Sequence, residues 1–230
     1  MQQFQRPPKR SILIIGIIGV CFFLYIFPLA LIPLLKIFSL GNVKFKIFIS
    51  ILHTWICLAL IYIFTRKVEK INLLVWDEVN YSLNQFAKLV IMILLILFAG
   101  SMVIGIILKL TGFNMDNDKI VHLLNVLKAN KLIIFVLSAS AAITEELIFR
   151  GYLLSRLQLL INDTYHSIVI SAILFSIAHY NYGTMKQLIG TFFIGLVLAF
   201  YYNKYRNIKV LIVCHFLWDY FAFILFLHFK

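Results

Sequence analysis

The chain has 230 residues, of which 63% are hydrophobic and only 13% are charged, whereas a soluble domain carries about a quarter charged residues. This composition excludes an ordinary soluble globular domain and predicts a membrane protein. The formal net charge of +12 is expected from juxtamembrane lysine and arginine that meet anionic lipid in the bilayer. Nucleic-acid binding is excluded, because no folded soluble module remains to present a basic face.

Apolar runs of about 18 to 25 residues, the length that crosses a bilayer, recur along the whole chain. We place seven spans near 11–35, 45–65, 87–110, 132–154, 166–182, 187–203 and 208–229. The fifth and sixth are short for a full crossing. Only helices and closed barrels satisfy their backbone in lipid, and the alternation typical of a barrel is absent. The sequence therefore predicts an all-α bundle of about seven transmembrane helices.

The first span follows the basic cluster RPPKR at 6–10, which favours a cytoplasmic N-terminus. We expect a retained helix rather than a signal peptide, because the apolar run is long and ends in no small-residue cleavage site. The polar connections 66–86 and 111–131 could each hold a short interfacial helix. The spans within 1–130 contain no acid, so this part is expected to be scaffold and 131–230 to be the catalytic bundle.

Ionisable residues inside transmembrane spans are functional candidates by default. In this chain they gather after residue 131 in three short motifs: Glu145, Glu146 and Arg150 in EELIFR, Phe175 and His179 in FSIAH, and His215 and Asp219 in HFLWD. Each motif alone also has a structural interpretation, as a salt bridge, a packing histidine or an interhelical tie. Their occurrence together, in a chain with few acids, favours a functional site.

Helical spacing assigns partners within these motifs. Residues four apart share a face, and adjacent residues point about 100° apart. Glu146 and Arg150 are therefore expected to pair, and so are His215 and Asp219. Glu145 has no partner on its own helix and needs one on another. At a rise of ~1.5 Å per residue, all of the motifs reach the middle of the membrane and could converge there.

In this order, Glu-Glu-x-x-x-Arg, Phe-x-x-x-His and His-x-x-x-Asn/Asp resemble the motifs of the CPBP family, the intramembrane CAAX proteases and bacteriocin-processing enzymes also called Abi proteins. Gly151 and Tyr152, which follow the arginine, also suit the family. The resemblance covers roughly residues 130–230. It implies hydrolysis of peptide bonds within the membrane.

The same resemblance implies roles for individual residues. Glu145 and His179 would activate a water, while His215 with Asp219 would polarise the scissile carbonyl or stabilise the oxyanion. Glu146, Arg150 and Phe175 would support them. Asp219 stands where CAAX prenyl proteases commonly have Asn, and an ionised Asp cannot donate a hydrogen bond to an oxyanion. Asp219 would therefore orient His215 or be protonated in its low-dielectric setting. The Asp in place of Asn fits the broader bacterial members of the family better than the prenyl proteases.

Family members are often described as metalloproteases, and the residues available to bind a possible zinc ion are Glu145, His179 and His215. If Glu145 were a ligand, however, no base would remain to take the proton of the water. The zincin motif HExxH is also absent. We therefore expect a site that works without tightly bound zinc.

The sequence as a whole predicts an intramembrane endopeptidase of the bacterial plasma membrane that cleaves a membrane-embedded peptide or protein substrate. One alternative is an immunity or partner-binding membrane protein, which would tolerate Glu145→Gln. The other is a small ion- or proton-coupled transporter, which would show flux in vesicles. No inverted repeat or pair of broken helices supports transport.

Overall fold

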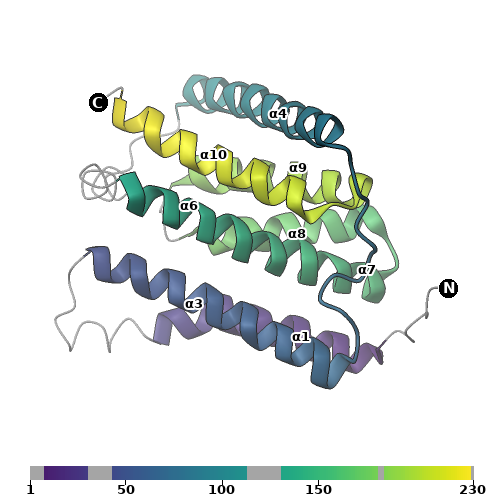
Figure 1. Ribbon diagram of the computed structural model, residues 1–230. Coiled ribbons are helices and arrows are strands. Elements are labelled where there is room, and N and C mark those ends of the chain that lie inside the picture. Colours follow the sequence, from purple (N-terminus) through teal and green to yellow (C-terminus); the bar gives the residue numbers. More distant parts are fainter. Residues whose placement is uncertain (1–7, 31–42, 113–130, 181–183, 229–230) are drawn as a thin grey trace.

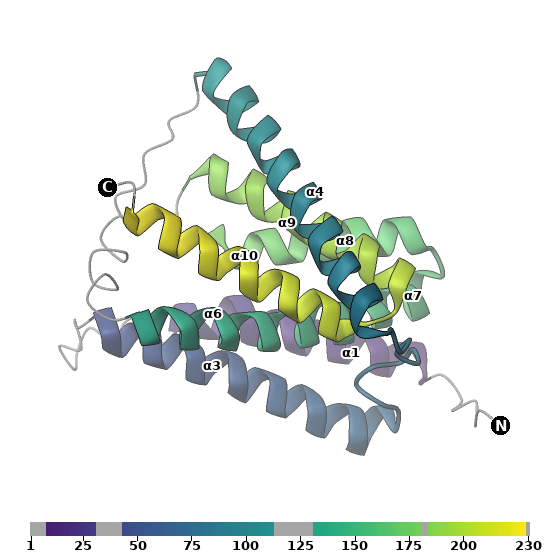
Figure 2. The same cartoon turned by 45° about the horizontal axis from the view of Figure 1, so that its top comes forward.

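The computed structural model describes residues 8–30, 43–112, 131–180 and 184–228, and all regular structure within these ranges is helical. In chain order the elements are α1 (Arg10–Cys21) with η1 (Phe22–Ile26), α3 (Val43–Phe64) with η2 (Thr65–Glu69), α4 (Leu83–Leu110), α6 (Lys131–Glu145) with η3 (Glu146–Leu154) and α7 (Ser155–Ile161), α8 (Thr164–Ala178), α9 (Met185–Tyr205) and α10 (Ile208–His228). The three η elements are π-helical segments that continue the α-helix before them. Helices α1 and α3 lie on one side of the bundle, α4 lies on the other, and α6, α8, α9 and α10 fill the space between (Figures 1 and 2).

The predicted all-α transmembrane bundle is confirmed, with one correction. Six helices in the described part of the chain are long and apolar enough to cross a membrane. The predicted fifth span, 166–182, corresponds to α8, which has only 15 residues. At a rise of ~1.5 Å per residue such a helix covers less than the ~30 Å hydrocarbon core. It ends at His179, inside the bundle; the ends of the predicted spans at 31–35, 181–182 and 229 lie outside the described residues.

The predicted interfacial helix in the connection 66–86 is wrong. The π-helical segment η2 continues α3 as far as Glu69 and stops at Lys70, whose φ of 58° is left-handed. Residues 70–82, which we call the strap, contain no helix, and α4 begins after Ser82, which forms a capping box with Gln85. Most of the other predicted connection, 111–131, lies outside the described residues.

The strap is held against the turn between α9 and α10. The backbone N–H of Val79 donates to the carbonyl of Arg206 at 2.8 Å, and Asn207 Nδ2 donates to the carbonyl of Val79 at 2.7 Å. The backbone N–H of Ile208 donates to the carboxylate of Glu78. Burial raises the pKa of Glu78, while the hydrogen bond from Ile208 acts in the opposite direction. These contacts fix the strap across one end of the bundle.

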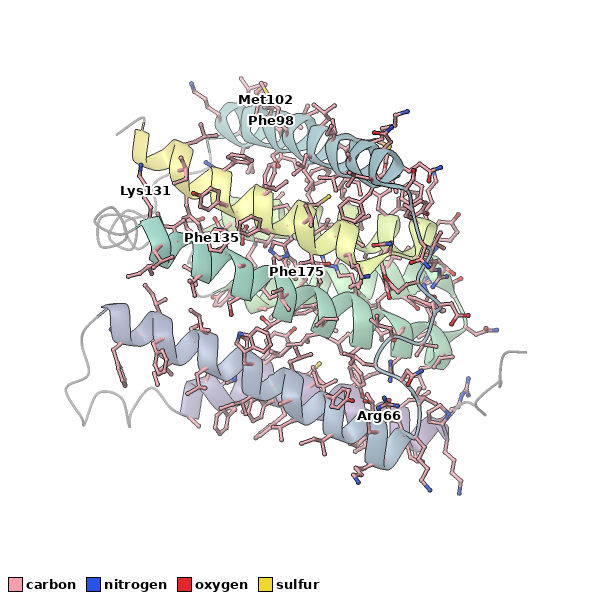
Figure 3. The ribbon with its side chains drawn as sticks, in the orientation of Figure 1. Arg66, Phe98, Met102, Lys131, Phe135 and Phe175 are labelled. Carbon is pink, nitrogen blue, oxygen red and sulfur yellow. The ribbon has the colours of Figure 1, made fainter. Side chains whose placement is uncertain are left out.

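The helix that carries EELIFR is the most buried of the six spans. In its apolar window 44% of the residues are buried, against 17–33% in the other spans. Segment η3 contributes side chains to two core clusters, one with α4, α9 and α10 and one with α1, α3 and α8. On the outer face of α4, by contrast, Phe98 and Met102 point away from the bundle, whereas Phe175 lies among the central helices (Figure 3). The motif helix is therefore the centre of the fold.

Helix α1 packs closely against η3 at Gly16. A Cβ atom at this position would lie 2.0 Å from the hydroxyl of Tyr152 and 2.7 Å from the ring of Phe64. Gly19, one turn further along the same helix, is exposed, and a Cβ there would have no neighbour within 4 Å. The two glycines therefore differ in what surrounds them and not in their helical setting.

We predict that Gly16→Ala lowers the thermal stability of the purified protein in detergent, because the added methyl group forces α1 away from Tyr152; overpacking of this kind costs about 1–3 kcal/mol. The matched variant Gly19→Ala should keep or slightly raise stability, since alanine is the better helix former by about 1 kcal/mol. Equal melting temperatures for the two variants would contradict the close contact.

Candidate active site

The motif EELIFR lies where the motif helix changes from α to π geometry. Glu145 is the last residue of α6, and Glu146 is the first residue of the nine-residue segment η3. A π-helix closes i→i+5 hydrogen bonds, and π segments inside α-helices occur frequently at functional sites. The spacing in the sequence predicts a continuous α-helix here, and the π-helical geometry from Glu146 onward is a difference from that prediction. The Glu146–Arg150 pair forms nevertheless.

Glu146 and Arg150 form a fully buried ion pair, as predicted. Arg150 Nη1 lies 2.7 Å from Glu146 Oε1, and the side-chain exposures are 1% and 0%. Arg150 Nη2 also donates to the carbonyl of Gly195 in α9 at 3.2 Å, and the guanidinium lies 4.4 Å from the centre of the Phe175 ring in α8. The arginine therefore connects the motif helix to two neighbouring helices.

Glu146 has a second partner that sequence reasoning missed. Oε1 of Glu146 lies 2.8 Å from Nδ1 of His215 in α10. A carboxylate that also pairs with Arg150 is ionised and can only accept, so Nδ1 of His215 carries the hydrogen. The two residues are 69 positions apart, and no local pattern connects them. Glu146 thus holds both an arginine and a histidine.

The expected contact between His215 and Asp219 is present, but it is the weaker of the two contacts of this ring. Asp219 Oδ2 lies 3.5 Å from Nε2 of His215, and its side chain is 29% exposed. The short, buried hydrogen bond from Nδ1 to Glu146 constrains the ring more than this longer contact does. Glu146 therefore makes the shorter and more buried contact with this ring, and Asp219 faces the other nitrogen.

His179 lies at the C-terminal cap of α8, where the helix stops. Its Nδ1 is 2.9 Å from the carbonyl oxygen of Phe175. A carbonyl only accepts, so Nδ1 carries a hydrogen, and in the neutral form of the ring the lone pair is then on Nε2. The ring centre of Phe175 lies 4.7 Å from that of His179 and 5.9 Å from that of His215. The ring of Phe175 therefore packs against both imidazoles.

Glu145 faces both histidines with one oxygen. Its Oε2 lies 3.8 Å from Nε2 of His179 and 3.9 Å from Nε2 of His215. Both separations exceed a direct hydrogen bond, and this oxygen is buried without a hydrogen-bond partner among the described residues. The structure thus brings Glu145, His179, His215 and Asp219 together from the motif helix, α8 and α10, as the sequence predicted.

The close packing that brings Phe175 into the site depends on Gly195, which sequence reasoning also missed. A Cβ atom on Gly195 would lie 3.1 Å from the Phe175 ring and 3.2 Å from Cα of Ala172. The sequence signal was a glycine in an apolar helix, where small residues mark close helix–helix contact.

The candidate zinc ligands Glu145, His179 and His215 do not form a metal site as they are arranged here. Within the part of the chain that the structure describes, no group of three or more His, Cys, Asp or Glu side chains is placed so that it could hold a metal ion. Both Nδ1 atoms are engaged, one by a carbonyl and one by Glu146.

The fold and the site together define an integral membrane protein with a buried acid–histidine centre where three helices meet. Residues 128–221 match the model of the family described as type II CAAX prenyl endopeptidase Rce1-like. These residues form a domain of this CPBP/Abi family, and the predicted resemblance is confirmed. Family membership suggests an intramembrane protease. Comparisons with curated proteins and with solved structures give no match.

We predict that Arg150→Ala lowers the amount of folded protein in the membrane as much as it lowers activity. Removing one partner of a buried ion pair leaves the other charge uncompensated, at a cost of about 3–5 kcal/mol. Accumulation is measured by immunoblot of washed membranes and by size-exclusion profile in detergent. A variant that accumulates normally but is inactive would show that Arg150 acts in the reaction itself.

Proposed function

We propose that this chain is an intramembrane endopeptidase that hydrolyses a peptide bond with a water activated by Glu145 and His179. The observation that supports this proposal best is the position of Glu145 Oε2, which lies within 4 Å of Nε2 of both histidines and has no hydrogen-bond partner among the described residues. One carboxylate oxygen and two imidazole nitrogens thus surround a space that a single water can bridge.

Each of the two residues accepts one hydrogen of this water. Glu145 Oε2 accepts the first and acts as the general base. The lone pair of His179 Nε2 accepts the second, because Nδ1 of that ring already donates to the carbonyl of Phe175. With both hydrogens held, the oxygen lone pair points at the substrate carbonyl. The hydrogen bond from Nδ1 to the carbonyl of Phe175 keeps this ring from turning.

His215 is the donor to the oxyanion in this proposal. Its Nδ1 hydrogen is held by Glu146 at 2.8 Å, and Asp219 Oδ2 lies 3.5 Å from Nε2. Because Nδ1 donates to Glu146, a donor on the other side of the ring requires a hydrogen on Nε2 as well, and the carboxylates of Glu146 and Asp219 supply matching negative charge on the two sides. That hydrogen is directed at the developing oxyanion, where a fixed donor is most effective. Asp219 holds the donor when no substrate is bound.

The proposed reaction balances without another reactant. The water oxygen bonds to the carbonyl carbon as its proton moves to Glu145, which forms a tetrahedral intermediate. Glu145 then returns this proton to the leaving nitrogen as the C–N bond breaks, and an amine and a carboxylic acid result. Glu146 and Arg150 take no proton; their mutual pairing keeps His215 in place.

The proposed substrate is a membrane-embedded peptide or a protein tail that enters the bundle. Glu145 and Asp219 keep 20% and 29% of their side chains exposed, whereas Glu146, Arg150 and His215 are buried. The reactive face of the site is therefore the accessible one. We place the protein in the bacterial plasma membrane. Because of Asp219, a substrate without a prenyl group is our preferred case.

We predict that Glu145→Gln, His179→Ala and His215→Ala each abolish processing while the protein still accumulates in the membrane. The first variant removes the base, the second removes one water contact and the third removes the oxyanion donor. Comparative peptidomics of cells that carry the wild-type protein or each variant measures this, and the peptides that disappear identify the substrate.

His166→Ala is the matched control for the two histidine variants. His166 lies in the first turn of α8, whereas His179 caps the other end of the same helix. The side chain of His166 is 77% exposed, and its Nδ1 lies 2.9 Å from Asp163 Oδ1, away from the site. It should process like the wild-type protein. Near-normal cleavage by Glu145→Gln would refute the role of Glu145 as the base. A cellular function that Glu145→Gln preserves, with no peptide cleaved by either protein, would favour a partner-binding protein. Ion flux in vesicles without cleavage would favour a transporter.

We also predict that the site works without tightly bound zinc, because Glu145 serves as base and the histidines serve as acceptor and donor. The purified protein is assayed for metal content and for activity after exhaustive chelation, with activity expected to persist. Stoichiometric zinc whose removal stops cleavage, and whose return restores it, would contradict this prediction.

A further inference from the structure

A second buried charged cluster lies beyond the far end of the π-helical segment η3. Arg156 is fully buried, and its Nη2 and Nε lie 2.6 and 3.0 Å from Glu69 Oε2. Glu69 Oε1 accepts from the hydroxyl of Tyr152 at 2.9 Å. Arg156 also donates to two strap carbonyls, Leu73 at 2.6 Å and Asn72 at 2.9 Å.

The proposed reaction uses neither Glu69 nor Arg156. A fully buried ion pair often contributes no more stability than apolar residues of the same size would. Its best-attested use is to select one register among several that are otherwise close in energy. We therefore ask which rotation of the motif helix this ion pair would select.

The π-helical segment η3 determines how the two ends of the motif helix are rotated relative to each other. A π-helix takes more residues per turn than an α-helix. The rotation of α7 relative to α6 therefore depends on how many residues stay in the π form. If part of η3 returned to α geometry, the two ends of the helix would rotate against each other. Glu145 and Glu146 could then not face His215 while Arg156 faced Glu69.

Both ends of the segment are tied to other helices. At the near end, Glu146 and Arg150 are held by His215 and by the carbonyl of Gly195. At the far end, Tyr152 and Arg156 are held by Glu69 at the end of η2 and by the strap. Arg156 is ten residues from Glu146, which is roughly 15 Å along a helix.

We propose that Arg156 and Glu69, with the strap carbonyls, are positioning residues that fix the rotation of the motif helix and thereby place Glu145 and Glu146 against His215. Their effect on cleavage rests on the proposed function, but their effect on site geometry does not. They act through the helix and touch neither water nor substrate.

The test compares Arg156→Met with Arg66→Gln in the full-length protein. Arg66 lies at the same end of the bundle, is exposed and donates to the side chain of Asn72. Two quantities are measured on folded, monodisperse protein: the cleavage rate on the peptide found by peptidomics, and the ring ¹⁵N signals of labelled histidine. The His215 signal is assigned by its loss in His215→Ala.

Arg156→Met should lower kcat at least 10-fold with little change in KM, and should shift the Nδ1 signal of His215 away from its hydrogen-bonded value. Arg66→Gln should leave both unchanged. An unchanged His215 signal in folded Arg156→Met would overturn the proposal, whatever the activity. If the wild-type protein cleaves nothing, the proposed function fails, but the His215 signal still decides the positioning role.

Tyr152→Phe keeps the test decisive if Arg156→Met does not fold. It removes only the hydroxyl that donates to Glu69 Oε1. A shift of the His215 signal in the same direction, with a loss in kcat of about threefold, supports the proposal. No shift of that signal overturns it.

Discussion

The carboxylate of Glu146 is the interaction on which the rest of the site depends. It is fully buried, and one of its oxygens accepts from both Arg150 and His215. An unpaired carboxylate inside a membrane bundle would be strongly unfavourable, so these partners cannot drift apart without a large penalty. Because Arg150 also contacts the carbonyl of Gly195 and the ring of Phe175, this one charge aligns four helices.

Because Glu146 is paired with Arg150 and His215, its neighbour Glu145 is left as the reactive acid. The two residues are adjacent, so their side chains point in different directions from the helix. Glu146 faces Arg150 and Nδ1 of His215, and Glu145 faces Nε2 of both imidazoles. Structural and reactive roles are thereby divided between two identical side chains. The division follows from geometry alone and needs no difference in chemistry.

The strap is held in place by contacts of a different kind from those that form the helices it joins. It carries no helix, yet several of its backbone groups have partners: the Arg156 side chain donates to the carbonyls of Asn72 and Leu73, Asn207 donates to the carbonyl of Val79, and the N–H of Val79 donates to the backbone carbonyl of Arg206. Buried backbone groups need such partners, and the Arg156 side chain provides two of them at the end of the bundle, while the lipid-facing surface stays apolar. The arginines that the composition placed at the membrane surface are therefore of two kinds: some, such as Arg66, are exposed, and others, such as Arg156, are buried and hold the fold together.

The sequence by itself determined the all-α membrane class, the spans near 87–110 and 187–203, and the site motifs, because length, apolarity and i,i+4 spacing are local properties. The pairing of Glu146 with Arg150 belongs to this group. Only the tertiary structure decided that Glu146 also holds His215, that the helix turns π-helical at the motif, and that Glu69 meets Arg156. These features join residues far apart in the chain, and their energies arise from the burial of charge between helices, which no local pattern encodes.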